Sequence, residues 1–216
     1  MNTSLTLVRD TTPLDQAKVA KNRNWRGASE IELRGAIERW GRARWPEARV
    51  CHELVMNRGS TRLDIAFVAP AYLAVVELKS GADTMERAIH QVGLARLSAH
   101  EVWLICDRRY GQDMRLIRHM LPTVGIAEAS GPFDQPPELT MLAEAVRAEP
   151  YPEAIASLLW VSELAAALRI GGARPGTHAS LAKRLAALPP AERDALVCRA
   201  LRGRDALWRA DPPVRH

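Results

Sequence analysis

The sequence predicts an α/β protein with a mixed central sheet, helices on both faces of that sheet, and a helical appendage at the C-terminal end. Three observations predict it. Three strand-like segments follow one another within residues 49–78, helical and strand-like segments alternate over residues 83–127, and only helical periodicity follows residue 150. A mixed sheet with helices on both faces is the natural solution for this order of elements.

The first element predicted is a helix that starts near Ser29. Residues 1–28 have no clear hydrophobic period and are interpreted as an N-terminal arm. Ser29 and Glu32 have the spacing of a capping box, in which two side chains satisfy free amides at a helix start. Apolar residues then recur at helical spacing up to Trp40, and Gly41 and Pro46 close the segment.

Three strands are expected next, at residues 49–56, 62–68 and 72–78. In the second, apolar residues alternate with Asp64 and Ala66, which is the period of a strand. The third is almost entirely apolar, as expected for a central strand that is buried on both faces. Turn-forming residues separate the three segments at 57–60 and 69–71.

The remaining elements follow from periodicity and from breaker residues. Helices are expected at 83–99 and 112–120, strands at 101–106 and 124–127, and a Pro/Gly-rich loop at 130–139. Three further helices are expected at 153–170, 179–188 and 191–202, separated by glycine and proline pairs. The chain thus divides into an N-terminal arm (1–28), an α/β core (29–135) and a basic helical C-terminal region (136–216).

Charge and composition limit the function classes. The chain has 30 lysines and arginines against 25 acidic residues, and residues 150–216 hold ten of the former against six of the latter. A basic segment fits a polyanion such as nucleic acid, although a merely solvated basic surface is the alternative. Three widely spaced cysteines argue against a disulfide framework or a structural zinc site. The absence of a long apolar run or signal-like start predicts a cytoplasmic protein with no membrane partner.

One group of residues carries chemistry. Asp64 lies near the end of the second strand, and Glu77 and Lys79 lie at the end of the third. Residues i and i+2 of a strand share a face, so Glu77 and Lys79 point the same way, and a hairpin would bring Asp64 beside them. Carboxylate oxygens bind Mg²⁺, and a lysine can assist an attacking water. The alternative is a set of surface ion pairs that involves Arg62 and Lys79.

Asp64, twelve residues, Glu77, one residue and Lys79 resemble the core motif of the PD-(D/E)XK restriction-endonuclease-like superfamily. The predicted order of helix, three strands, helix and strand over residues 29–107 resembles the core of that superfamily too. Leu63 stands where a proline precedes the aspartate in some members.

The resemblance implies a metal-dependent endonuclease. Mg²⁺ or Mn²⁺ would be held by Asp64, Glu77 and the backbone carbonyl of Leu78, and Lys79 would serve the attacking water. Many members add an acidic residue upstream, for which Glu53 and Glu30 are the candidates. Charge favourable to a helix N-terminus is the alternative role of Glu30.

The helix that follows the motif offers two supporting residues. Gln91 is similar to a glutamine found there in some members and would bind water at the metal site or a phosphate. Arg87 lies one turn earlier on the same face and would contact a phosphate, or else pair with Asp83. Residues 77–87, together with Leu158 to Trp160, resemble small bacterial and phage-associated members.

Four basic residues are the candidates for nucleic-acid contacts: Arg62, Arg174, Lys183 and Arg184. DNA is favoured over RNA as the partner. Sites of this superfamily often act in pairs, so the resemblance also admits a homodimer. Two alternative functions stay open: a non-catalytic nucleic-acid-binding module on the same fold, and a partner-binding protein.

Overall fold

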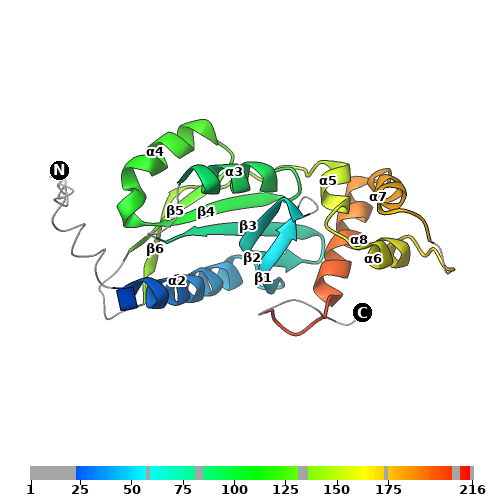
Figure 1. Ribbon diagram of the computed structural model, residues 1–216, viewed down its shortest axis with the longest axis horizontal. Helices are drawn as coiled ribbons and strands as arrows, with labels where there is room; N and C mark the ends of the chain where they lie inside the picture. The colour runs from blue at the N-terminus through cyan, green and yellow to red at the C-terminus, as the bar shows by residue number, and fades with distance from the viewer. Residues whose placement is uncertain are drawn as a thin grey trace.

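The computed structural model describes residues 23–56, 59–80, 85–130, 136–172, 175–205 and 210–214, without the side chains of 23–30, 109, 111 and 112. Residues 1–22 of the predicted N-terminal arm lie outside the described residues. The first described helix begins at Arg23, so the prediction that it starts near Ser29 is wrong, and the spacing of Ser29 and Glu32 falls inside the helix. Figure 1 shows the elements, which are α2 (Arg23–Arg44), β1 (Arg49–Met56), β2 (Thr61–Ala69), β3 (Tyr72–Lys79), α3 (Met85–Ala95), β4 (Glu101–Asp107), η2 (Arg108–Tyr110), α4 (Gly111–Met120), β5 (Gly125–Ser130), β6 (Glu138–Ala143), α5 (Pro152–Ala156), α6 (Val161–Ala167), α7 (His178–Ala186) and α8 (Pro190–Gly203).

The six described strands form one mixed sheet in the order β1-β2-β3-β4-β5-β6. Strands β1, β2 and β3 are antiparallel neighbours, β3, β4 and β5 run parallel, and β6 returns antiparallel to β5. The two parallel steps are the ones bridged by α3 and α4, because a parallel pair needs a crossover connection. The predicted fold class is confirmed.

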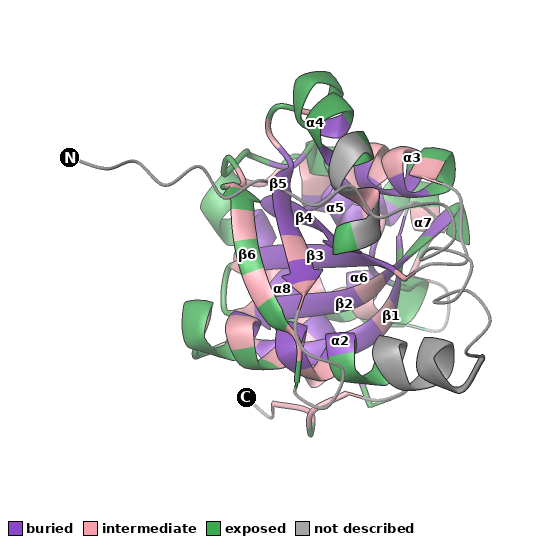
Figure 2. Cartoon of the chain, turned by 90° about the vertical axis from the view of Figure 1, so that its left-hand side faces the viewer, coloured by how far each residue is buried: buried purple, intermediate pink, exposed green. Residues whose placement is uncertain are grey.

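Helices cover both faces of the sheet. On one face, Leu33 and Ile37 of α2 pack with Val76 and Trp103. On the other face, α3, α4 and the C-terminal helices form the larger core cluster. In Figure 1, α3 and α4 lie above the sheet, α2 lies below it, and α5 to α8 gather at its right-hand end. Figure 2 shows the resulting burial, with purple strands inside and green outer helix surfaces.

The prediction of a final strand at 124–127 and a loop after it is wrong in one respect. Residues Glu138–Ala143 form a sixth strand at the edge of the sheet, with exposed and half-buried residues in strict alternation. Half-buried Leu139 and Met141 pack on the α2 face of the core, and the banding of β6 is visible in Figure 2. The neighbouring Pro136 and Pro137 obscure this short period-2 signal in the sequence.

A single helix over 153–170 is also wrong, because two short helices, α5 and α6, occupy this segment. Leu158 and Leu159 lie buried in the break between them. The backbone amide of Trp160 donates to Glu163 at 2.7 Å, which caps the start of α6. Arg204 holds the same carboxylate at 2.6 Å. Tertiary contacts therefore fix a break that helical periodicity alone does not predict.

The C-terminal region packs on the sheet rather than standing apart from it. Leu181, Leu185, Val197 and Leu201 belong to the same core cluster as Val75. Together with β6, these contacts make residues 136–216 a part of the sheet and its core, not a purely helical appendage. No helix in the described part of the chain is long and apolar enough to span a membrane.

One buried arginine joins the first strand to the end of the chain. The guanidinium of Arg49 donates to the carbonyl oxygens of Leu201, Arg202 and Arg204 at 3.1, 2.9 and 2.8 Å. These are backbone acceptors at and just beyond the end of α8. A cation there satisfies carbonyls that the helix itself cannot pair.

Candidate active site

The predicted motif lies at the open end of the β2–β3 hairpin. The two strands pair up to Ile65 opposite Val76, and continuing the register by one residue places Asp64 opposite Glu77. Beyond the last backbone pair, the side chain of Asp64 bonds to β3: its Oδ2 accepts a hydrogen bond from the amide of Leu78 at 2.7 Å. The hairpin that the sequence predicts is confirmed, and it brings the two carboxylates together.

Glu77 and Lys79 point to the same face of β3 and are both buried, with 4% and 1% of their surface exposed. Lys79 pairs in register with Cys106 of β4. Glu77 reaches the pocket described next, whereas Lys79 is not among the described residues that line it. Lys79 is therefore buried outside this lining, on the same face of β3 as Glu77.

A pocket of about 220 Å³ opens at this end of the sheet. It collects seven of the residues that the sequence nominates and two that it does not, Arg34 and Ser80. The lining consists of Arg34, Glu53, Arg62, Asp64, Glu77, Leu78, Ser80, Arg87 and Gln91. Strands β1, β2 and β3 form its floor and contribute Arg62, while α2 contributes Arg34 and α3 contributes Arg87 and Gln91.

Glu53 reaches the pocket through an unusual backbone. Its φ is +57°, in the left-handed region that non-glycine residues rarely adopt. Cys51 and Leu54, three residues apart, both join the same core cluster, although an odd spacing in a regular strand would put them on opposite faces. Arg34 and Arg62 hold the Glu53 carboxylate at 3.0 and 2.7 Å. Local strain at a pocket is typical of functional sites.

Arg34 is the principal site residue that the sequence interpretation missed. Its Nη2 contacts Oδ1 of Asp64 at 2.8 Å and Oε1 of Glu53 at 3.0 Å. Only 8% of its surface is exposed. Arg34 stands directly beside Leu33 in the apolar stripe of α2, and a basic residue within such a stripe is the signal that could have identified it.

Gln91 of α3 lines the pocket and carries a buried acceptor. Its Nε2 donates to the carbonyl of Arg62 at 3.0 Å. Its Oε1 is buried and has no hydrogen-bond partner among the described residues, and the residue as a whole is 9% exposed. A buried amide oxygen normally has a partner, so this one fits a bound water or cation.

The donor set fits Mg²⁺ or Mn²⁺. No group of three His, Cys, Asp or Glu side chains in the described ranges is arranged to hold a metal by itself. Mg²⁺ does not need one, because it usually keeps several waters and takes one or two carboxylates. The Asp64 and Glu77 carboxylates, the Leu78 carbonyl and Oε1 of Gln91 supply the oxygen atoms such an ion prefers.

Two of the other nominated residues lie far from this pocket. Lys183 and Arg184 are exposed on α7, which packs on α5 and α6. The C-terminal helices meet β3 at its opposite end: His100 accepts from the amide of Leu73 and contacts Asp194 of α8. Arg174 and the side chain of Glu30 lie outside the described residues.

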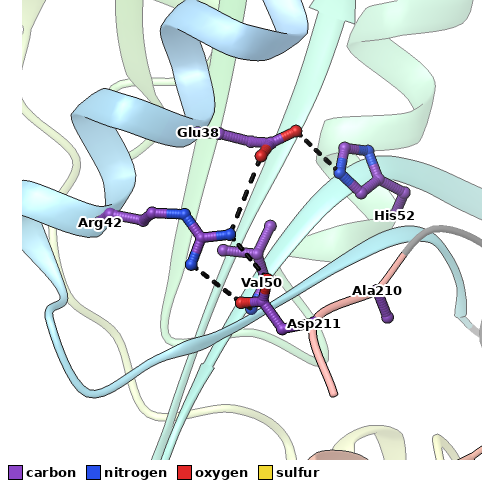
Figure 3. A pocket seen from close by; sticks show the side chains of 6 residues that line it. All are labelled: Glu38, Arg42, Val50, His52, Ala210 and Asp211. Atoms are coloured by element: carbon purple, nitrogen blue, oxygen red, sulfur yellow. Dashed lines mark hydrogen bonds and ion pairs between the residues drawn. The ribbon is translucent and has the colours of Figure 1, made fainter.

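A second pocket of about 220 Å³ lies on the other side of His52 (Figure 3). His52 contacts Glu38 there through Nε2 at 3.0 Å, and its Nδ1 lies 3.4 Å from Arg34 of the first pocket. Arg42 and the amide of Val50 both bind the carboxylate of Asp211. The polar groups of this pocket thus pair with one another. The contacts of Asp211 hold the C-terminal segment against β1.

Comparisons with known proteins place the chain in a family. A family model described as bacteriophage P4 protein cII matches residues 30–211. No curated protein and no solved structure gives a match. The matched region includes every residue that lines the first pocket and most of the C-terminal region. Since it covers well over half of the sequence, the chain belongs to the bacteriophage P4 protein cII family.

Proposed function

We propose that this protein is a Mg²⁺- or Mn²⁺-dependent nuclease that hydrolyses phosphodiester bonds in DNA, as the PD-(D/E)XK resemblance implies. The observation that carries the proposal is the convergence of Asp64, Glu77 and Gln91 on one pocket, where the buried Oε1 of Gln91 has no hydrogen-bond partner among the described residues. These residues are up to 27 positions apart in the sequence and meet at one end of the sheet. Surface ion pairs alone would not require them to meet there.

Six of the nominated residues have a defined part in this proposal. Asp64, Glu77 and the Leu78 carbonyl would hold the ion, which when bound activates water and neutralises charge on a phosphate. Arg62 and Arg87 line the pocket with positive charge and would attract and orient the phosphodiester. Lys79 shares its face of β3 with Glu77 and would place a positive charge beside the attacking water.

The direct test is cleavage by the purified full-length chain. Linear, circular and branched DNA, and RNA, would be incubated with Mg²⁺, Mn²⁺ or EDTA. We expect metal-dependent cutting of DNA that Asp64→Asn and Glu77→Gln abolish. Glu86→Gln is the matched control, because Glu86 is an exposed acid of α3 outside the pocket lining. Cutting that survives in both site variants would refute the assignment.

A non-catalytic nucleic-acid-binding module is the second candidate, and one observation favours it. The guanidinium of Arg34 already bridges Asp64 and Glu53, so a fixed positive charge partly satisfies the carboxylates. In that case the protein would bind DNA equally well with EDTA and would cut none of the substrates.

The remaining features of the proposal concern compartment and assembly. We propose that the protein acts in the cytoplasm, which suits its three cysteines because all are buried and free. Burial raises the pKa of the Cys51 thiol to about 11, so this cysteine is a poor nucleophile at neutral pH. A homodimer would allow two sites to act on two strands.

A further inference from the structure

Arg34 places a positive charge between two carboxylates of the first pocket. One nitrogen, Nη2, contacts both Oδ1 of Asp64 and Oε1 of Glu53, at 2.8 and 3.0 Å. It therefore lies between two carboxylates contributed by neighbouring strands. In sites that hold two metal ions, a bridging carboxylate keeps the ions about 3.5–4 Å apart, and the second ion needs oxygen atoms of this kind.

The side chain of Arg34 is held in that position by burial and by further contacts. Its side chain is only 10% exposed. Its other terminal nitrogen, Nη1, donates to the backbone carbonyl of Asp64 at 3.1 Å and lies 3.4 Å from Nδ1 of His52. His52 is itself held by Glu38 at 3.0 Å. A guanidinium keeps its charge at every physiological pH, so the positive charge here is permanent.

The Glu77 side of the pocket differs from the Glu53 side. Glu53 has arginine partners on both of its oxygens, Arg34 on Oε1 and Arg62 on Oε2. On the other side, Gln91 belongs to the same lining as Glu77 and Leu78, and its buried Oε1 has no hydrogen-bond partner among the described residues. One side of the pocket therefore carries a buried amide oxygen without a partner among the described residues, and the other side carries a resident cation.

We propose that Arg34 takes the place of a second metal ion, so that the site binds one divalent cation and Arg34 supplies the second positive charge. The proposal rests on the proposed metal-dependent function and specifies its metal stoichiometry. Arg34 is then a positioning residue: it fixes Asp64 and Glu53 and neutralises them without itself dissociating. Removing its charge should open a second cation site between these two carboxylates.

The test is the number of Mn²⁺ ions bound per chain, measured by titration calorimetry and by the electron paramagnetic resonance signal of free Mn²⁺. We expect one ion for the full-length wild-type chain and two for Arg34→Met, which keeps an unbranched side chain without the charge. Arg34→Lys keeps the charge and should stay at one. Arg87→Met is the matched control, because it removes an arginine from the same lining and should also stay at one.

A further variant keeps the test decisive. Adding Glu53→Gln to Arg34→Met removes one of the two carboxylates and should return the count to one, with circular dichroism confirming that each variant is folded. Two ions in the wild type, or one ion in both the wild type and folded Arg34→Met, would overturn the inference. If Arg34→Met failed to fold, a count of two in Arg34→Lys would overturn it and a count of one would support it.

Failure of the proposed function has a different signature. No ion in the wild type but one in Arg34→Met would refute metal-dependent catalysis while supporting Arg34 as the resident cation. No ion in either protein would overturn both proposals.

Discussion

Oδ2 of Asp64 accepts a hydrogen bond from the backbone amide of Leu78 at 2.7 Å, across the point where the β2–β3 ladder ends. The same carboxylate binds Arg34 through Oδ1. Asp64 thus joins two strands and a helix while it faces the pocket. A change at this position is therefore expected to affect stability as well as the proposed chemistry, and the two effects need separate measurements.

Asp64→Ala should destabilise the fold more than Asp64→Asn. Alanine leaves the Leu78 amide and the Arg34 guanidinium without this acceptor, a loss of about 1–3 kcal/mol. Asparagine keeps one acceptor oxygen in place. Urea unfolding of both variants would measure the difference in unfolding free energy. Equal stability of the two would show that the Asp64 contacts contribute nothing to the fold.

Lys79→Met should reduce the rate of DNA cleavage by about 10²–10⁴-fold, the range for loss of a positioned proton-transfer or charge-stabilising group. Methionine is chosen because Lys79 is almost wholly buried and an unbranched apolar side chain fits the same space. Mn²⁺ binding should persist, because Asp64 and Glu77 are intact. A full cleavage rate in this variant would remove Lys79 from the proposed chemistry.

Arg62→Ala should weaken DNA binding and lower the dependence of log Kd on log salt concentration by about one, as expected for one lost phosphate contact. Arg62 lines the pocket, whereas Lys183 and Arg184 are on α7 at the other end of the molecule. Fluorescence anisotropy over a salt series would compare Arg62→Ala with the double variant Lys183→Ala/Arg184→Ala. A larger effect in the double variant would locate the nucleic-acid surface on α7 instead.

Arg49→Ala should destabilise the protein by on the order of 3 kcal/mol, because it leaves several buried carbonyl oxygens without their charged donor. These are the acceptors in Leu201, Arg202 and Arg204. Urea unfolding would measure the loss, with Arg39→Ala, an exposed change on α2, as the control. A similar midpoint for both variants would contradict a structural role for Arg49.

Acid should destabilise the fold through Asp194. Burial opposes ionisation of this carboxyl, but the hydrogen bonds and charges of His100 and Arg193 outweigh it, so its pKa is lowered in the folded protein. A lowered pKa adds stability that is full above the unfolded-state value, about 3.9 for Asp, and is lost as the pH falls through the folded value.

Unfolding free energies measured between pH 6 and the acid limit should therefore fall more steeply below about pH 4 for the wild type than for Asp194→Asn. The comparison concerns the slope, because the substitution also changes stability at neutral pH. Parallel curves would show that Asp194 does not contribute to the acid sensitivity.

The sequence predicted the central part of this protein well. The alternation in β2, the apolar run in β3 and the turn residues between them specify a hairpin, and its register alone brings Asp64 beside Glu77. Buried strands with short connections leave few alternatives, since a one-residue slip would turn every core side chain outward. The helix after the motif likewise places Arg87 and Gln91 one turn apart, on one face.

Only the tertiary structure decided the rest. Arg34 reaches Asp64 from 30 positions away, and no local period encodes a contact between a helix and a strand that pack face to face. The edge strand β6 and the break between α5 and α6 depend on partners that come from elsewhere in the chain. Local patterns determine which elements form and which way their side chains point. The packing of those elements against each other decides which charges meet, and at this site it set an arginine between two carboxylates.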